Sequence, residues 1–277
     1  MNALAPLAAA LAPTGLNLTG SVRSREWDAV MAPARQTSAL LPGATTIAVF
    51  ANGGPSLWRA FLADLDADPR GLIDEANPFD AFVRRVVLAA DASLGDLPRR
   101  WFWAAADAEV HVDFRMLAHL AGIGHASRLG LLLDDRFGPW LGLRAACFWV
   151  EPGAELGEPL PPVSPAEPPL SEHCVGCSRC VQGCPGAAFP AGRWAVDTCS
   201  TFHHLSDACT SRCQAREACP IGAEQRYDAD EIVYHYNRAA GREALRRRLG
   251  VPQGVDRFDG IGPHWGDWRK RVDVKGG

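Results

Sequence analysis

The residues with the clearest chemistry are the cysteines, of which the 277-residue chain has nine. Eight fall between Cys174 and Cys219, and the first four of these follow the pattern C-x2-C-x2-C-x3-C-P. In bacterial ferredoxins this spacing lets three cysteines bind one iron–sulfur cubane while the fourth reaches a second cluster. Pro185 prevents a local helix from continuing, which helps to turn Cys184 away from the first three. The pattern therefore predicts [4Fe–4S] chemistry in this segment.

The remaining cysteines form a second set with looser spacing, which ends in the same Cys-Pro pair at Cys219 and Pro220. Together the two sets supply enough thiolates for two clusters. The crossed arrangement of ferredoxins assigns the last cysteine to the first cluster and the fourth cysteine to the second. The predicted ligands are Cys174, Cys177, Cys180 and Cys219 for one cluster, and Cys184, Cys199, Cys209 and Cys213 for the other.

Other interpretations of these cysteines stay open. Four-cysteine zinc sites also use paired cysteines, but not a triple C-x2-C-x2-C run followed by Cys-Pro. One cluster with spare thiols would also satisfy the first set. His203 and His204 could replace a ligand, as in a Rieske centre, although eight cysteines already suffice for two cubanes. Cys147 lies apart in an apolar stretch and is expected to be a buried small hydrophobic residue.

The composition is that of an ordinary globular protein, with 47% hydrophobic and 22% charged residues. A formal net charge of −4 argues against non-specific nucleic-acid binding, which needs a concentrated basic face. The apolar N-terminal stretch has no basic residue before Arg23 and is interrupted by Pro6 and Pro13. We therefore expect neither an export signal nor a membrane span, and a cytoplasmic location in which metal is a better explanation of the cysteines than disulfides.

Hydrophobic patterns upstream of the cysteines change between helix and strand periods. Apolar runs rich in β-branched residues predict strands, and amphipathic stretches with proline in the first turn predict helices. A mixture of this kind favours an α+β fold or an α/β sandwich. The expected strands are residues 16–22, 45–50, 109–114 and 141–150, and the expected helices are an N-terminal helix and residues 56–65, 78–90 and 116–121, the last ending in a turn at 122–124.

The chain changes character on either side of the cysteine segment. Proline and glutamate dominate residues 151–170, which predicts a linker or extended wrap. Residues 228–249 have the pattern of one long helix, opened by a capping box of Asp228 and Glu231 and ended by Gly250. Three arginines in its last turn are expected to stabilise the negative end of the helix dipole.

The stretch AGIGHASRLGLLLDDRFGPWLGLRAACF, residues 121–148, followed by the cysteine segment, resembles the corresponding part of epoxyqueuosine reductase and of reductive dehalogenases. The resemblance covers roughly residues 105–220 and includes the order of the cysteines. It implies a nitroreductase-like, cobalamin-binding domain combined with two [4Fe–4S] clusters. Two features of the first family are missing, because HASRLG at residues 125–130 replaces GWIGKN and no C-terminal helical repeats follow. A tRNA partner is therefore not expected.

A second, weaker resemblance is to the cobalamin-processing family of methylmalonic aciduria and homocystinuria type C, which has the same nitroreductase-like core without clusters. The matching pieces are Glu109-Val110-His111, Arg136-Phe137-Gly138, Trp140, Arg144 and Glu224-Gln225-Arg226-Tyr227. Together the two resemblances imply an α+β, nitroreductase-like α/β sandwich with a double-cluster, ferredoxin-like module inserted before the last helix. The implied domains are residues 1–165, 166–225 and 226–277.

Both resemblances imply a bound corrinoid. His111 would lie near it, and the loop from Gly122 and Gly124 to Arg128 would approach one face of the ring. Arg144 and Arg226 match arginines that bind the thiol co-substrate glutathione in the processing family. Asp107 and Asp113 both lie near the position of the general acid of the tRNA-modifying family. Each of these residues could instead serve an ordinary structural purpose, as a core histidine, an ion-pair partner or a helix terminus.

The combined hypothesis is an iron–sulfur oxidoreductase that passes electrons from an external donor, such as a ferredoxin, flavodoxin or reductase, through two clusters to a corrinoid. The corrinoid would be either a cofactor acting on a small-molecule substrate or cargo that the protein processes. Two alternatives use the same cysteines. One is an electron carrier whose large domain only docks partners, and the other is a reductase that holds flavin in place of corrinoid.

Overall fold

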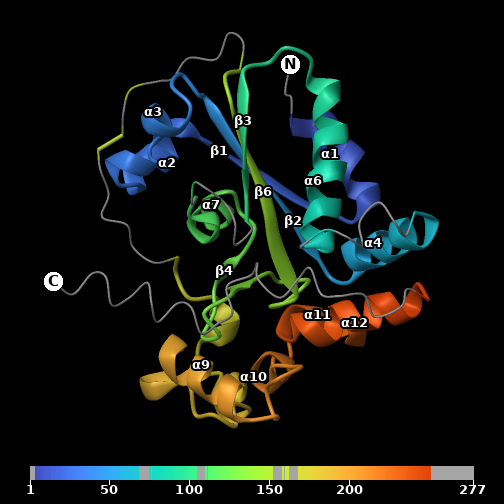
Figure 1. Ribbon diagram of the computed structural model, residues 1–277. Helices are drawn as coiled ribbons and strands as arrows, with labels where there is room; N and C mark the ends of the chain where they lie inside the picture. The colour runs from blue at the N-terminus through green and yellow to red at the C-terminus, as the bar shows by residue number, and fades with distance from the viewer. Residues whose placement is uncertain are drawn as a thin grey trace, which may run out of the picture.

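The computed structural model describes residues 4–68, 75, 77–104, 110, 112–151, 158, 160–161 and 168–250. A four-stranded antiparallel sheet with the strand order β1-β2-β6-β3 lies at its centre. Strand β2 pairs on one side with β1 and on the other with β6, so the two middle strands lie between edge strands (Figure 1). The strands are β1 (Leu18–Arg23), β2 (Thr46–Gly53), β3 (Arg99–Trp103) and β6 (Leu141–Trp149).

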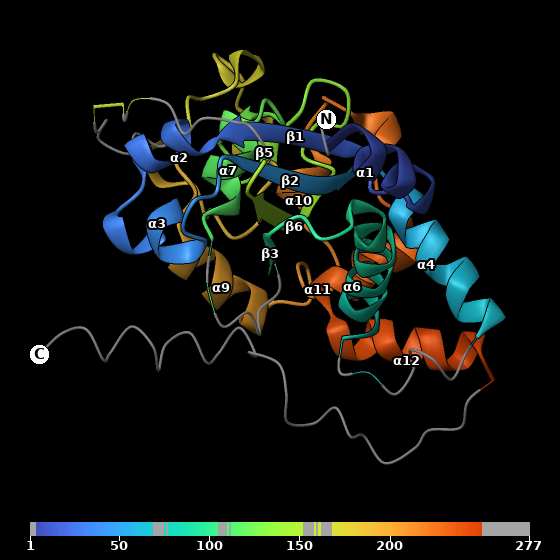
Figure 2. The ribbon, with the colours of Figure 1, turned by 90° about the horizontal axis from the view of Figure 1, so that it is seen from above.

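Helices cover both faces of the sheet, as Figures 1 and 2 show. Alternate residues of β2 point to opposite faces, which gives each face its own core. Ala48 and Phe50 join a core around Trp58, whereas Ile47 and Val49 join a core around Trp27. The first face carries α1 (Leu4–Leu11), α4 (Ser56–Ala67), α6 (Pro78–Asp91), α11 (Ala229–Tyr236) and α12 (Arg238–Arg248), and the second carries α2 (Ser24–Val30), α3 (Thr37–Leu40) and α7 (Phe114–Leu120).

The cysteine segment lies beyond one end of the sheet, in yellow and orange at the bottom of Figure 1. It is built from short helices, and a third hydrophobic cluster joins it to the turns that precede β6. Its helices are α8 (Arg179–Gln182), α9 (Val196–Leu205) and α10 (Gln214–Glu217), with 3-10 turns at Glu172–Cys174, Pro190–Gly192 and Ala223–Gln225. A two-stranded ribbon, β4 (His125–Ala126) and β5 (Leu132–Leu133), and further 3-10 turns at Ala12–Thr14, Pro33–Arg35 and Ala92–Leu94 complete the described elements.

The mixed helix-and-sheet class is confirmed, as are the strands expected at 16–22, 45–50 and 141–150. The helices expected at 56–65, 78–90 and 116–121 are α4, α6 and α7. The sequence analysis did not predict β3, β4, β5, α2, α3 or the short helices α8, α9 and α10. No helix in the described ranges is long and apolar enough to cross a membrane.

Two expected elements were wrong. Residues 228–249 form two helices rather than one, because Asn237 leaves the helical conformation at φ −133° and its side chain caps the second helix by accepting from Ala240 N. The expected capping box is absent, since Asp228 pairs with Arg59 and Glu231 is fully buried. The strand expected at 109–114 is not formed by its described residues, because Val112 and Asp113 belong to no strand and Phe114 begins α7; residues 109 and 111 lie outside the described residues.

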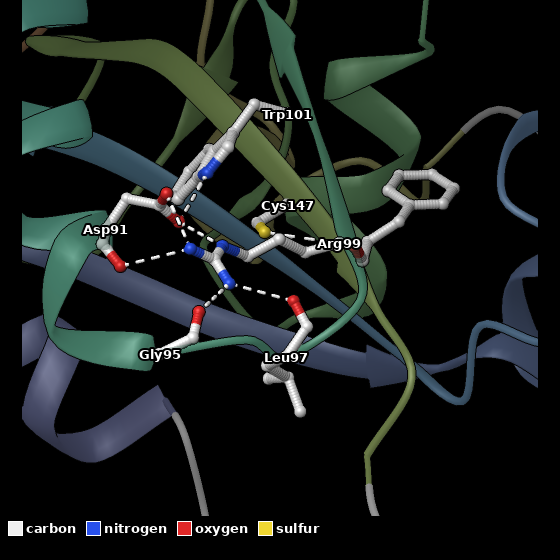
Figure 3. Close-up of polar contacts among 7 residues, drawn as sticks. Asp91, Gly95, Leu97, Arg99, Trp101 and Cys147 are labelled. Carbon is white, nitrogen blue, oxygen red and sulfur yellow. Dashed lines mark hydrogen bonds and ion pairs between the residues drawn. The ribbon is translucent and has the colours of Figure 1, made fainter.

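A polar corner joins α6 to the edge strand β3 (Figure 3). The Arg99 guanidinium donates to the Asp91 carboxylate and to the carbonyls of Gly95 and Leu97, and Trp101 Nε1 donates to Asp91 at 2.9 Å. Burial raises the pKa of Asp91, but the bonds from Arg99 and Trp101 outweigh it and hold the pKa below its ordinary value. Cys147 lies beside this corner and is fully buried, which confirms its expected role in the core.

We expect Asp91→Asn to destabilise the fold by about 1–2 kcal/mol, because it leaves a largely buried guanidinium without its counter-charge. Asp66→Asn is the matched control, since Asp66 pairs with Arg248 on a surface where both side chains are 46% exposed. That variant should leave the midpoint of urea unfolding almost unchanged. Equal midpoints for the two variants would contradict the importance of the corner.

Candidate functional site

The eight clustered cysteines come together as two groups of four. Cys174, Cys177, Cys180 and Cys219 line one pocket, with Arg128 and Ile221 among the other residues of its wall. Three of these four side chains belong to residues that are only 8% exposed. Burial raises the pKa of Cys180, and the neighbouring thiols of Cys174, Cys177 and Cys219 raise it further. The structure thus places Cys219 with cysteines about forty positions earlier in the sequence.

The other four thiols form the second group. Burial raises the pKa of Cys209, and the thiols of Cys213, Cys184 and Cys199 add to the shift. Burial likewise raises the pKa of Cys213, with Cys199 contributing. Charged thiolates disfavour ionisation of a nearby thiol, which is why each of these cysteines raises the pKa of another in its group. These groups have the same members as the two predicted ligand sets, and the assignment of the cysteines as cluster ligands stays a prediction.

Backbone amides are directed at the sulfurs of the second group. Ala188 N donates to Cys184 Sγ at 3.5 Å, and Arg216 N donates to Cys213 Sγ at 3.4 Å. Such bonds favour a thiolate over a thiol and are one of the means by which proteins adjust cluster potentials. In the described ranges, no three Cys, His, Asp or Glu side chains are arranged as ligands of a single metal ion. The four thiolates of a cubane are spaced more widely than those of a mononuclear site, because they bind its four corners.

Two glycines let the cysteine segment dock directly on the turn that precedes β6. Gly138 and Gly222 both have positive φ, of 58° and 65°. A Cβ on Gly138 would lie 1.9 Å from the Ile221 carbonyl oxygen, and one on Gly222 would lie 2.3 Å from the Phe137 carbonyl carbon. No side chain fits between backbones that approach so closely. The position of Cys219, three residues before Gly222, is therefore determined by this contact.

Arg128, in the proposed corrinoid loop, lines the pocket of the first thiol group together with its neighbour Ser127. Its guanidinium donates to the carbonyl oxygens of Cys174 at 3.2 Å and of Gly192 at 3.4 Å. It therefore ties the loop after α7 to two separate parts of the cysteine segment.

The other residues of that loop have structural explanations. Gly122 and Ile123 end α7 in a Schellman motif, with Gly122 N bonded to His119 O and Ile123 N to Ala118 O. A Cβ on Gly124 would lie 2.7 Å from the Leu133 carbonyl oxygen, so packing against β5 requires a glycine there. The Asp113 carboxylate caps α7 by accepting from Met116 N at 3.0 Å. The corrinoid-binding roles expected of Gly122 and Gly124, and the catalytic role expected of Asp113, stay predictions.

The predicted arginine pair is not brought together in one pocket. Arg144 donates to Asn52 Oδ1 at 2.7 Å and lies 4.7 Å from the ring centre of Phe79, beneath α11. Arg226 donates to the Glu217 carbonyl and lines a polar surface pocket that also contains Arg136. Asp107 and His111 lie outside the described residues, and the roles assigned to all four stay predictions.

A buried polar cluster between the sheet and α11 was missed by the sequence analysis. It contains Arg144, Arg216, Tyr227, Glu231 and His235, and neither carboxylate oxygen of Glu231 has a hydrogen-bond partner. Burial raises the pKa of Glu231 to about 8, although Arg144 and Arg216 oppose the shift. Burial, followed by the same arginines, lowers the pKa of His235 well below its ordinary value. The Glu231 carboxyl lies 3.8 Å from the His235 ring. These shifts favour the neutral form of both side chains near pH 7.

The raised pKa of Glu231 makes stability fall with pH. An unfolded glutamate loses its proton near 4.5, whereas the folded chain keeps it up to about pH 8. Between these pH values the folded state holds a proton on Glu231 that the unfolded state has lost. The stabilisation that this proton gives the fold is complete below pH 4.5 and is lost as the pH approaches 8. Glu231→Gln removes the proton but keeps the shape. As the pH rises from 4.5 to about 8, the free energy of unfolding of the wild type should fall relative to that of the variant. The expected slope is about 1.4 kcal/mol per pH unit.

Urea unfolding at a series of pH values measures this difference. Glu224→Gln is the control, because Glu224 is exposed; its curve should run parallel to that of the wild type. Parallel curves for Glu231→Gln as well would show that Glu231 is ionised in the fold.

The described sheet, the helices on both faces and the appended cysteine segment define a mixed helix-and-sheet fold. Comparison with solved structures gives the particular fold, which is that of epoxyqueuosine reductase. One such enzyme, solved with an epoxyqueuosine-modified tRNA-Tyr stem loop, matches with a TM-score of 0.51 at 16% identity, over 82% of this chain and 67% of that one. The enzyme from Streptococcus thermophilus matches with a TM-score of 0.51 at 14% identity, over 90% and 80%.

A catabolic reductive dehalogenase also aligns, with a TM-score of 0.43 at 16% identity, over 84% of this chain but only 34% of its own. No protein-family profile and no curated protein sequence matches the chain. The resemblance to epoxyqueuosine reductase is thus confirmed for the fold, and that to the cobalamin-processing family stays a prediction. The tRNA stem loop held by one structural neighbour does not support the expectation that tRNA is not a partner.

Proposed function

We propose that this protein is an iron–sulfur oxidoreductase that holds two [4Fe–4S] clusters. The observation that carries the proposal is the grouping of eight thiols into two sets of four, the first of which joins Cys219 to cysteines about forty positions earlier. A double cubane site needs this crossed grouping, and zinc sites built from local cysteine pairs do not. Cys174, Cys177, Cys180 and Cys219 would hold one cluster, and Cys184, Cys199, Cys209 and Cys213 the other.

The protein's own groups supply the environment of these clusters. When bound, each cluster stores one electron at a potential set by burial and by hydrogen bonds to its sulfurs. The amides of Ala188 and Arg216 provide such bonds to the second group. Arg128 holds the loop after α7 against the first group through the Cys174 carbonyl. An external one-electron donor is required, because the cysteine segment can pass electrons but cannot generate them.

A corrinoid is the proposed electron acceptor, supported by the fold shared with epoxyqueuosine reductase and by the sequence resemblance. A bound corrinoid would supply a redox-active cobalt, while the protein would supply binding and orientation. Of the residues expected to hold it, Arg128 lies beside the first thiol group, whereas Asp113, Gly122 and Gly124 have structural roles. An electron carrier without corrinoid is therefore the second candidate, favoured by these structural roles.

Anaerobic purification, followed by iron, sulfide and cobalamin-binding assays on one sample, tests the proposal. About eight irons and eight sulfides per chain are expected for two cubanes. Tight cobalamin binding with a change in its sharp visible bands would support the corrinoid proposal. Eight irons without cobalamin binding would identify the electron carrier, and bound zinc in place of iron would refute both. Absorbance from a bound flavin would identify a reductase that holds flavin in place of a corrinoid.

The ligand assignment makes a prediction about single cysteines. Cys184→Ser should remove or alter the second cluster alone, leaving about four irons of unchanged spectroscopic signature. Cys177→Ser should do the same to the first cluster. Cys147→Ala is the control and should retain all of the iron, because this thiol lies in the sheet core. Electron paramagnetic resonance of the reduced proteins separates the clusters, and identical spectra for the two serine variants would overturn the crossed assignment.

A further inference from the structure

A polar surface pocket lies where the sheet domain meets the chain that follows the cysteine segment. Its volume is about 300 Å³, which is the lower end of the range for sites that bind small molecules. None of the eight clustered cysteines is among its described lining residues, so it is separate from the thiol groups. Three arginines from distant segments line it, namely Arg59 of α4, Arg136 of the turn before β6 and Arg226 after Cys219.

Two of these arginines are held in place by hydrogen bonds that use only part of their capacity. Arg59 donates from Nε and Nη2 to the two carboxylate oxygens of Asp228, each at 2.8 Å. Arg226 donates from Nη2 to the Glu217 carbonyl. A guanidinium has five N–H donors, so each of the two keeps donors for a ligand.

Arg136 is held by an aromatic ring instead. Its guanidinium lies 4.9 Å from the ring centre of Phe137. The ring is fixed in turn, because Phe137 is buried and a Cβ on Gly53 would lie only 2.4 Å from it. In the part of the chain that the structure describes, the Arg136 guanidinium makes no hydrogen bond and no ion pair. All of its donors are therefore available at the pocket.

The charges around the pocket leave an excess of positive charge. Asp228 neutralises Arg59, and the exposed carboxylate of Glu224 in the wall offsets one of the other two arginines. Guanidinium groups that line one cavity repel one another, and an anion bound between them relieves this repulsion. A phosphate monoester carries a charge of about −1.5 to −2 near pH 7 and three acceptor oxygens that point in different directions. It therefore suits donors that come from three segments better than a planar carboxylate does.

We infer that this pocket binds the phosphate group of a small phosphate monoester, which Arg59, Arg136 and Arg226 hold together. The site goes beyond the proposed function and does not depend on the clusters, because no thiol takes part in it. A monoester is favoured over the phosphodiester backbone of a nucleic acid, which needs an extended basic face, whereas the chain has a net charge of −4. The bound phosphate would link α4 to the chain after Cys219.

Isothermal titration calorimetry at constant ionic strength tests the inference, with inorganic phosphate and ribose 5-phosphate as probes and acetate as the planar competitor. Both phosphates should bind saturably, the sugar phosphate more tightly because the pocket is larger than a phosphate ion, and acetate more weakly than either. Arg136→Gln should weaken phosphate binding by about ten-fold or more, because it removes hydrogen bonds between a charged donor and a charged acceptor.

Two further variants separate a specific site from general attraction between charges. Arg25→Gln makes the same charge change at an exposed position on α2, which covers the opposite face of the sheet from α4, and it should keep the wild-type affinity. Glu224→Gln removes the carboxylate of the wall and should bind phosphate several-fold more tightly, since it removes a repulsion.

The absence of saturable phosphate binding, acetate binding as tight as that of phosphate, or equal losses in the two arginine variants would each overturn the site. Iron analysis of the same samples reports on the proposed function separately. Eight irons without phosphate binding would overturn the phosphate site alone, and phosphate binding without iron would overturn the clusters alone.

Discussion

The direct backbone contact between Gly138 and Gly222 is the constraint on which the arrangement of the thiols depends. It joins the turn before β6 to the chain just after Cys219, and no side chain fits at either glycine. Phe137 strengthens the joint, because its ring lies where a side chain on Gly53, at the end of β2, would have to be. Cys219 is thereby placed by the sheet and its turns.

The charged side chain of Arg216 makes a second contact between the cysteine segment and the turn before β6. The guanidinium bonds to Pro139 O and stacks on Trp140, both in the turn that also contains Gly138. Burying an unpaired cation is costly, and the aromatic faces and the carbonyl offset part of that cost. Glu231 lies in the same cluster but keeps its proton near neutral pH, so it does not neutralise the arginine. The positive charge thus remains available to the neighbouring thiol group.

The sequence was informative wherever a local pattern had only one physical meaning. The cysteine spacing predicted the crossed grouping, and the apolar runs predicted β2 and β6, because buried strands need continuous hydrophobic residues. It was uninformative where tertiary contacts decided the outcome. Asn237 interrupts a helical pattern by capping the next helix, and Glu231 is polar in sequence but fully buried. The edge strand β3 has arginine and tryptophan in place of the usual β-branched alternation, and it was missed for that reason.

The evidence for iron and the evidence for a corrinoid differ in kind. Asp113, Gly122 and Gly124 each have a local structural role that explains the residue without any ligand, as a helix cap, a helix end and a close packing contact. Of the eight thiols, Cys213 has a comparable local role, because its sulfur caps α10. Gathering them in two groups raises the pKa values of several, which opposes ionisation and gives the fold nothing that apolar side chains would not give better. The amides of Ala188 and Arg216 directed at sulfur would stabilise the negative charge of a cluster ligand, and the second of these bonds also caps α10. The proposal of metal clusters therefore rests on the thiol groups themselves, whereas the proposal of a corrinoid rests on the shared fold and the sequence resemblance.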